Sequence, residues 1–313
     1  MKAWVKREGE LRLAEVPDPT PAADELLVRV HAVSLNRGEI RTAARAREGV
    51  VPGWDVAGTV VAPAPNGKGP GAGARVAALL GAGAWAELVA VPASRAAIVP
   101  EEVELAVAST LPIAALTVQR ALDVAGSLVA RRMLVTGGTG GVGQFAIQLG
   151  ALAGARVCAV SSRAAQHAHL RALGATEVAS SVDEATGTFD LVLESVGGRS
   201  LARAIELVAR AGVIVTIGNS AEETTTFDAR TLYAKGAATI YGLIIFEEME
   251  SGRVGARDLE RLLALVREGK LQAPIEVRRS WQELPATMRD LEQGAYAGKA
   301  VLIVDAPGRS ETT

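Results

Sequence analysis

A glycine-rich turn between an apolar run and a helix-like segment constrains the fold of this 313-residue chain most strongly. Residues 134–143 read "LVTGGTGGVG", and "QFAIQLGALAG" follows. The glycines of Gly138-Thr139-Gly140-Gly141-Val142-Gly143 fit the pattern G-x-G-x-x-G. A strand, this turn and a helix in succession predict a site where the phosphates of a dinucleotide meet a helix N-terminus.

Each glycine of the pattern has a separate expected task. Gly138 allows the tight turn, Gly140 lets the backbone approach a pyrophosphate, and Gly143 lets the helix pack closely on the strand. The mononucleotide phosphate loop ends in Gly-Lys-Ser/Thr, but Gln144 follows Gly143 here. This excludes a mononucleotide loop and leaves a purely structural glycine turn as the alternative.

The rest of the chain divides into three stretches of different pattern. The first hundred residues hold short, valine-rich runs such as "ELLVRVHAVSL" and "WAELVAVP", which predict a compact β-barrel or sandwich. In the middle, apolar runs such as "ARVCAVSS" and "TFDLVLESVG" alternate with helix-length segments, which predicts βαβ units and a parallel sheet buried on both faces. The end is mixed, with an amphipathic helix in "ARDLERLLALVREGK" and a strand in "KAVLIVD".

The turn after the second strand of the predicted sheet indicates which dinucleotide binds. An NAD site usually has an acidic residue there for the ribose 2′-hydroxyl. No acid occurs between Gly143 and Glu177, and Ser161, Ser162 and Arg163 occupy the turn. Two hydroxyls and a guanidinium suit a 2′-phosphate, so NADPH is favoured over NADH. The alternative is that Arg163 is only a solvated charge at a helix start.

Composition excludes several classes of protein. The formal net charge is -2, whereas a general nucleic-acid binder usually has a basic excess. Cys158 is the single cysteine, so neither an internal disulfide nor a multi-cysteine metal site can form. The polar start "MKAWVKREGE" is unlike a signal peptide, and no apolar run approaches the ~20 residues of a membrane span. We therefore expect a cytoplasmic protein with neither a membrane nor a nucleic-acid partner.

Several motifs in order along the chain resemble the medium-chain dehydrogenase/reductase family. They include "VSLNRGE", "VPGWDVAGTVV", "LPIAALTVQRAL", "TGGTGGVGQFAIQLG" and "GKAVLIV". The resemblance implies an α/β fold with a GroES-like β-barrel lobe and a Rossmann lobe, whose parallel sheet is doubly wound. It implies a catalytic domain made of residues 1–108 and 247–313, with an NADPH-binding domain at 109–246 between them.

The stretch Gly53-Trp54-Asp55 directs the resemblance to the zinc-free, quinone oxidoreductase-like branch. Zinc-dependent relatives carry Gly-His-Glu there, and an indole cannot bind zinc. Without that Lewis acid, a conjugated acceptor is easier to reduce than an isolated carbonyl, because its developing charge is delocalised. We therefore expect an NADPH-dependent enzyme that transfers hydride to a quinone or to the conjugated C=C of an enone, both electron-poor small molecules.

The resemblance also assigns functional positions. Asn36 matches a position near the nicotinamide and is the first catalytic candidate. The family tyrosine is missing from "NRGEIRTAARAREG", so the proton donor is open, and Tyr241 is the replacement candidate. His167 and His169 are not expected to be catalytic. The predicted coenzyme-binding residues are Thr117, Gly138, Thr139, Gly140, Gly141, Val142, Gly143, Ser161, Ser162, Arg163, Ser195, Ile217, Gly218 and Asn219.

Two other functions remain open from the sequence. The same hydride chemistry could serve an enoyl-thioester reductase of a biosynthetic pathway, and Arg37, Arg41, Arg45 and Arg47 could then face an acidic or thioester-linked substrate. They could equally form a solvated helix face. The other alternative is an NADPH-binding structural or RNA-binding protein. In this family, the strand in "AATIYGLII" tends to pair with its copy, so a homodimer is expected.

Overall fold

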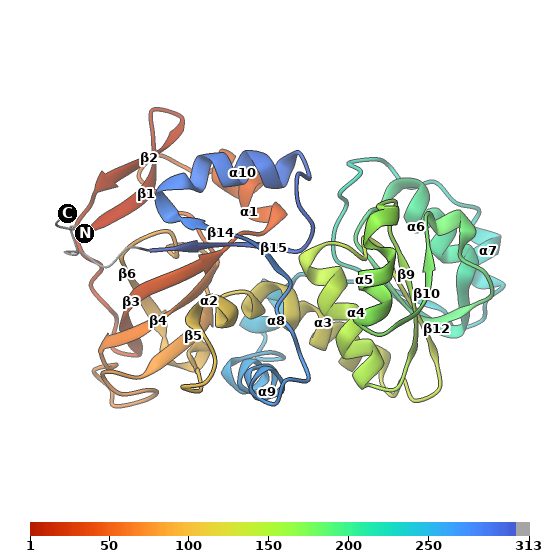
Figure 1. Cartoon of the computed structure of the whole chain (residues 1–313), viewed down its shortest axis with the longest axis horizontal. Helices are drawn as coiled ribbons and strands as arrows, with labels where there is room; N and C mark the ends of the chain where they lie inside the picture. Colours follow the sequence, from red (N-terminus) through yellow and green to blue (C-terminus); the bar gives the residue numbers. More distant parts are fainter. Residues whose placement is uncertain (305–313) are drawn as a thin grey trace. The chain divides into compact units, whose positions relative to one another are not determined.

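The computed structural model describes residues 1–304, which form two compact units (Figure 1). The first contains residues 1–116 and the segment from Val254 onward, and the second is Thr117–Arg253. The boundaries expected from the sequence, 108/109 and 246/247, lie a few residues before these divisions. The N-terminal and C-terminal segments therefore build one unit, and the chain between them builds the other.

The first unit is a mainly antiparallel, barrel-type sheet. Seven strands include the path β14-β15-β3-β4-β5-β7, and β6 pairs with β3. The central strand β3 alternates between buried and half-buried side chains, as the sequence pattern predicts. The bounds are β3 Glu25–Ser34, β4 Asp55–Ala62, β5 Arg75–Leu79, β6 Leu88–Pro92, β7 Ala97–Ile98, β14 Ile275–Ser280 and β15 Lys299–Ile303, with a separate hairpin of β1 Lys2–Arg7 and β2 Glu10–Glu15.

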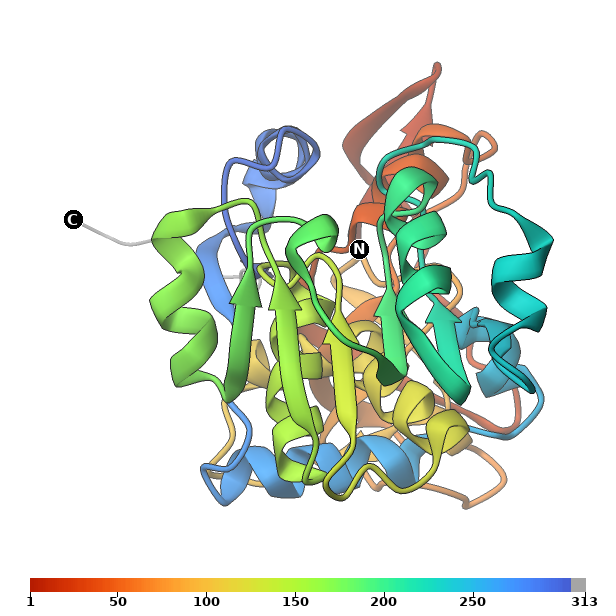
Figure 2. The same cartoon turned by 90° about the vertical axis from the view of Figure 1, so that its right-hand side faces the viewer.

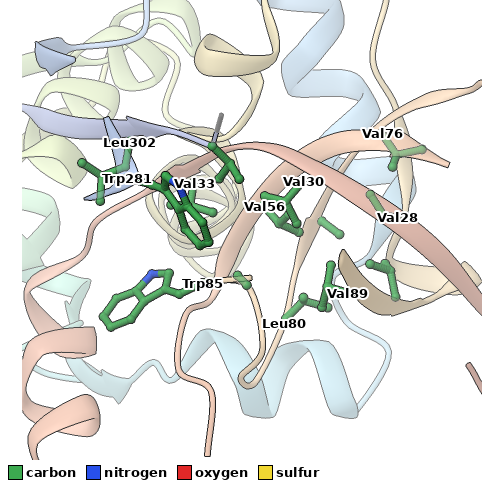
Figure 3. Close-up of a cluster of buried hydrophobic side chains, with 14 of the residues drawn as sticks. Val28, Val30, Val33, Val56, Val76, Leu80, Trp85, Val89, Trp281 and Leu302 are labelled. Atoms are coloured by element: carbon green, nitrogen blue, oxygen red, sulfur yellow. The ribbon is translucent and has the colours of Figure 1, made fainter. Parts of the chain in front are cut away.

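The core of the first unit is aliphatic with tryptophans at one end (Figure 3). Val28, Val30 and Val56 come from the adjacent strands β3 and β4, and Trp85 and Trp281 are almost fully buried. Burying side chains of this size contributes roughly 1.5–3 kcal/mol each. This packing fixes the strand ends from which the polar residues described below project.

The second unit is the predicted parallel sheet with its helices (Figure 2). Its six strands have the order β10-β9-β8-β11-β12-β13, and every pair between them is parallel. Strand β9 lies on one side of β8, and β11 lies on the other side. Parallel sheets bind nucleotides at the carboxyl ends of the strands where the strand order reverses in this way. The bounds are β8 Arg132–Val135, β9 Arg156–Val160, β10 Ala175–Ala179, β11 Phe189–Glu194, β12 Val208–Thr216 and β13 Thr239–Gly242.

The helices follow the amphipathic segments of the sequence. In α9, for example, Leu259, Leu262 and Leu263 are buried, as their spacing predicts. No helix within residues 1–304 is long and apolar enough to cross a bilayer. The bounds are α1 Arg37–Ala44, α2 Leu105–Ala108, α3 Leu111–Ala125, α4 Gly141–Leu152, α5 His167–Ala172, α6 Gly198–Leu207, α7 Ala229–Tyr233, α8 Ile245–Glu250, α9 Ala256–Arg267 and α10 Leu284–Glu292.

Candidate functional site

The glycine-rich turn joins β8 to α4 and presents the start of a 12-residue helix. The Gly138 N–H donates to the Val160 carbonyl, 2.8 Å away, which ties the turn to the end of β9. A Cβ on Gly143 would collide with the Gly137 carbonyl oxygen, so the start of α4 packs tightly against the glycine-rich turn. Gly140 caps α4 with no side-chain hydrogen bond. The turn therefore fits a phosphate group, which the helix N-terminus attracts.

The neighbouring strand ends bring further predicted coenzyme residues to the same edge. Ser195, after β11, donates from its hydroxyl to the Thr136 carbonyl at 3.2 Å, next to the glycine-rich turn. Ile217, after β12, donates its N–H to the Glu194 carbonyl at 2.8 Å. The neighbouring Gly218 approaches Ser195 closely enough that an added Cβ would lie 3.2 Å from the serine carbonyl oxygen. The ends of β8, β11 and β12 thus form one continuous surface in the second unit.

The turn at 161–163 follows β9 at this same edge. Ser161 is buried, Ser162 is exposed, and Arg163 is half-buried. The Ser161 hydroxyl accepts a hydrogen bond from the Arg163 N–H at 3.1 Å, which closes the turn. A guanidinium pairs well with phosphate, and the preference for a 2′-phosphate expected from these residues stays a prediction.

Two other candidates lie outside these turns, and one of them, Tyr241, pairs with Val215 near the carboxyl end of the same sheet. Thr117 is buried on α3, and no hydrogen bond within residues 1–304 links it to the turns above. The Tyr241 hydroxyl on β13 donates to Glu248 Oε1 at 2.5 Å. Arg253 and Arg120 also bind this carboxylate, and the hydrogen bond from Arg253 is the main cause that lowers the pKa of Glu248 to about 2. The Tyr241 proton is therefore already held by an ionised carboxylate, and its catalytic role stays a prediction.

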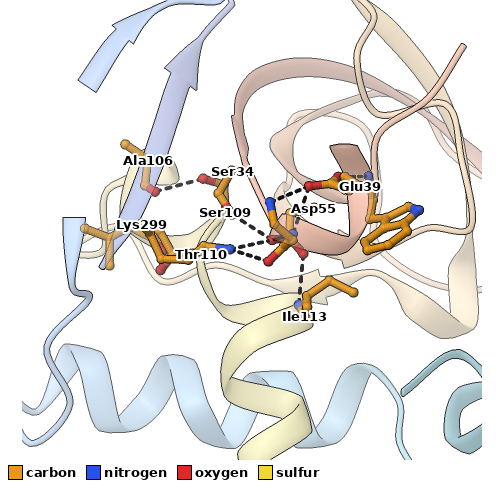
Figure 4. Close-up of polar contacts among 11 residues, drawn as sticks. Ser34, Glu39, Asp55, Ala106, Ser109, Thr110, Ile113 and Lys299 are labelled. Atoms are coloured by element: carbon orange, nitrogen blue, oxygen red, sulfur yellow. Dashed lines mark hydrogen bonds and ion pairs between the residues drawn. The ribbon is translucent and has the colours of Figure 1, made fainter. Parts of the chain in front are cut away.

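A buried polar cluster, formed by Ser34, Glu39, Asp55 and Lys299 with the half-buried Asn36, lies in the first unit (Figure 4). Asp55, fully buried at the start of β4, is its centre. Asp55 Oδ2 accepts from the Ser34 hydroxyl at 2.6 Å, the Asn36 amide at 2.8 Å and the Lys299 ammonium at 3.1 Å. Its other oxygen accepts the Ile113 N–H at 2.9 Å. Four donors on one carboxylate hold β3, β4, β15 and the start of α3 together.

The side chain of Asn36 is fully engaged inside this cluster. Its Nδ2 donates to Asp55 at 2.8 Å and to Glu39 at 3.0 Å, and its Oδ1 accepts from Lys299 at 2.6 Å. An amide has two donor hydrogens, so donation to a substrate would require one of these bonds to break. The catalytic role of Asn36 stays a prediction, whereas its contacts give it a structural task.

Glu39 is a second buried carboxylate in the cluster, 1% exposed on α1. It accepts N–H groups from Asn36 and from Trp54, each at 2.7 Å. Burial, together with repulsion from Asp55, raises its pKa to about 8, although Lys299 and the hydrogen bonds act in the opposite direction. A pKa raised in this way favours the protonated form of Glu39 at neutral pH.

The residues present do not fit a zinc site. Within residues 1–304, no group of three histidine, cysteine, aspartate or glutamate side chains could hold a metal ion. Cys158 is buried on β9, and Trp54 packs against Gly38, so neither supplies a ligand beside Asp55. The cluster instead balances its carboxylates with the Lys299 ammonium.

Sequence reasoning missed several of these residues. Lys299 gives no local signal, because its partners Asn36 and Asp55 are remote in sequence. Glu39 is one of several polar residues of α1, so the sequence does not mark it as buried. Glu194 was missed too, although it is fully buried and accepts the Gly197 N–H at 2.9 Å and the Ser200 hydroxyl at 2.8 Å, which holds the loop after β11. One signal was available, because Glu194 and Asp55 are acidic residues next to apolar strand runs.

Comparisons with known proteins agree with this architecture. Residues 22–101 match the family model of the alcohol dehydrogenase GroES-like domain, and residues 141–265 match that of zinc-binding dehydrogenases. The chain is 27% identical over 316 residues to the chloroplast envelope quinone oxidoreductase homolog of Arabidopsis thaliana, with 93% of each protein covered. The quinone oxidoreductase structure from Coxiella burnetii matches with a TM-score of 0.81 and 25% identity, over 97% of this chain and 98% of that one.

Part of a much larger protein is also similar. Erythronolide synthase EryA2 of Saccharopolyspora erythraea is 31% identical over 310 residues. This alignment covers 91% of the present chain but only 8% of the synthase. The similarity therefore concerns one segment of that protein.

Proposed function

Because the chain belongs to the medium-chain dehydrogenase/reductase family, in its quinone oxidoreductase-like branch, we propose that it is a zinc-independent NADPH reductase. Its substrate is a quinone or the conjugated C=C of an enone. The observation that carries the proposal is the edge formed by the glycine-rich turn and the turn at 161–163, which fits a dinucleotide with a 2′-phosphate.

The donor chemistry of the chain also supports a conjugated acceptor. When bound, a reduced nicotinamide supplies the hydride. The described residues offer no set of zinc ligands to polarise an isolated carbonyl, and the one cysteine is buried. Conjugation spreads the developing negative charge to an oxygen that N–H donors or water can stabilise. Quinones and enones therefore suit this chain better than simple alcohols.

A substrate panel tests the proposal. Steady-state rates are measured with NADPH and NADH against quinones, 2-alkenals and an enoyl-CoA, and with NADP⁺ against ethanol and benzyl alcohol. We expect turnover with NADPH and a quinone or enone, unchanged by chelators, together with substoichiometric zinc in the purified protein. Oxidation of the alcohols with no reduction of quinones or enones would contradict the proposal.

We predict that Arg163→Ala raises the apparent KM for NADPH about tenfold or more and hardly changes that for NADH. The expected pair between its guanidinium and the 2′-phosphate is worth about 1.5–3 kcal/mol. Arg156→Ala, at the opposite end of β9, is the control and should change neither KM. Equal use of NADH and NADPH by the unmutated protein would disprove the coenzyme preference.

One observation favours an enoyl-thioester reductase as the second candidate. The chain matches a segment of a polyketide synthase, and Arg41, Arg45 and Arg47 line a surface hollow beside α1. An anionic carrier group could approach these charges. Strong preference for enoyl-CoA in the same panel would identify this function. If nothing in the panel is turned over although NADPH binds, a structural or RNA-binding role would remain, which the net charge of -2 does not favour.

We propose that a second copy of the chain pairs with β13, and we therefore predict a homodimer. This strand is at one edge of the six-stranded sheet, and Ile240 and Ile244 nearby are 38% and 61% exposed. Soluble proteins usually cover such an apolar edge. Sedimentation should show a dimer at micromolar concentration and a monomer for Ile240→Lys. A monomeric unmutated protein would contradict this prediction.

A further inference from the structure

Two histidines of the short helix α5 lie against the part of the chain that would receive the coenzyme's phosphates, one at the turn 161–163 and one at the start of α4. His167 Nε2 lies 2.7 Å from the Ser161 carbonyl oxygen, so this nitrogen carries the hydrogen and donates it. His169 Nε2 lies 2.9 Å from Gln144 Oε1 on the first turns of α4. Leu170, next to His169, is fully buried, and a Cβ on Gly138 would lie 3.5 Å from it. Helix α5 is therefore anchored against both the turn at 161–163 and the start of α4.

Gln144 connects the second histidine to the glycine-rich turn. Its side chain is buried, with the residue 4% exposed, and Nε2 donates to the Thr139 carbonyl at 3.0 Å. This bond directs the amide oxygen of Gln144 toward His169, which must then donate from Nε2. A free carbonyl oxygen would repel a phosphate at this position. Because the Thr139 carbonyl accepts a hydrogen bond from the buried Gln144 amide, the N-terminus of α4 favours an anion.

We propose that Gln144 and His169 position the pyrophosphate turn of the coenzyme site, whereas His167 positions the 2′-phosphate turn. The proposal rests on the coenzyme site of the proposed function and deepens it. None of the three residues needs to touch the coenzyme, because each acts through a backbone carbonyl or a neighbouring side chain. The two tasks are therefore separable by ligands that carry only one kind of phosphate.

The test measures dissociation constants, so it does not depend on turnover. ADP carries a pyrophosphate without a 2′-phosphate, and adenosine 2′-monophosphate carries the reverse. Gln144→Met should weaken ADP, NADH and NADPH roughly three- to tenfold, as expected for one lost hydrogen bond, and leave adenosine 2′-monophosphate unchanged. His167→Ala should weaken adenosine 2′-monophosphate and NADPH by a similar factor and leave ADP and NADH unchanged.

Three further variants separate positioning from general damage. His167→Gln keeps a donor and should restore most of the binding lost in His167→Ala. Adding His169→Ala to Gln144→Met should have little further effect, because both act through one contact. Arg171→Ala, exposed on the same helix, is the control and should leave every dissociation constant unchanged.

Either of two results would overturn this inference and leave the proposed function intact. One is equal weakening of ADP and adenosine 2′-monophosphate by both variants, and the other is a lowered melting temperature with unchanged dissociation constants. Absence of NADPH and NADH binding by the unmutated protein would instead overturn the proposed function, and the inference with it.

Discussion

Lys299→Met is expected to lower the free energy of unfolding by about 3–5 kcal/mol, the usual cost of removing one partner from a buried ion pair. The Lys299 side chain is 4% exposed and lies 3.1 Å from a fully buried Asp55. Its ammonium also lies 2.6 Å from Asn36 Oδ1. Methionine fills much of the same volume but leaves Asp55 and Glu39 without a cation in this cluster. The measurement is chemical denaturation of both proteins in the same buffer.

Lys270→Met is the matched control. Lys270 pairs with Glu268 at 2.8 Å, but both side chains are about half exposed, and such pairs contribute roughly 0–1 kcal/mol. The Lys299→Met loss should also be larger at pH 9 than at pH 5, because Glu39 is neutral at the lower pH and only Asp55 then lacks its cation. A loss no greater than that of Lys270→Met would show that Lys299 does not stabilise the cluster.

A double variant measures how strongly the pair is coupled. Asp55→Asn combined with Lys299→Met should be less destabilised than the sum of the two single variants, because the double variant leaves neither ion of this pair alone. Simple additivity would show that the two charges act independently.

The parallel sheet and the positions of two turns at one edge of it could be predicted from the sequence because local patterns encode them. Strand-length apolar runs between helix-length segments predict βαβ units, and the carboxyl ends of parallel strands meet at one edge. The turns at 138–143 and 161–163, with Ser195 and Ile217, lie on the adjacent strands β8, β9, β11 and β12, as the pattern indicates. The short, valine-rich runs also predicted a β-barrel or sandwich for the first hundred residues. The resemblance supplied the return of the C-terminal segment to it, because no local pattern could reveal that β15 pairs with β3.

The buried polar cluster could not be predicted, because its contacts join residues that are remote in sequence. Lys299 and Asn36 are 263 residues apart, and Lys299 and Asp55 are 244 apart. Hydrophobic periodicity shows which positions are apolar, but it does not show that a charged residue beside an apolar run has a buried partner. The resemblance assigned Asn36 a position near the nicotinamide, but it did not reveal the hydrogen bonds that occupy both of its amide hydrogens.

Glu39 should make the protein less stable as the pH rises from about 5 to about 8. Its pKa is about 8 in the folded protein, against 4.5 for an ordinary glutamate. Between these values the folded state holds one proton that the unfolded state has released. Stability from this group is therefore fully present below about pH 4.5 and is lost as the pH rises through about 8. One such proton gives a slope of about 1.4 kcal/mol per pH unit.

Glu39→Gln isolates this contribution, because glutamine does not titrate. The variant should be less stable at pH 5, since its amide would place an N–H group against donors from Asn36 and Trp54. The difference from the unmutated protein should then shrink steadily toward pH 8, because the stability that the unmutated protein draws from its bound proton falls by about 1.4 kcal/mol per pH unit. Glu260→Gln, on the exposed face of α9, is the control and should keep the slope of the unmutated protein. A difference between Glu39→Gln and the unmutated protein that stays constant from pH 5 to pH 8 would show that Glu39 does not take up a proton on folding.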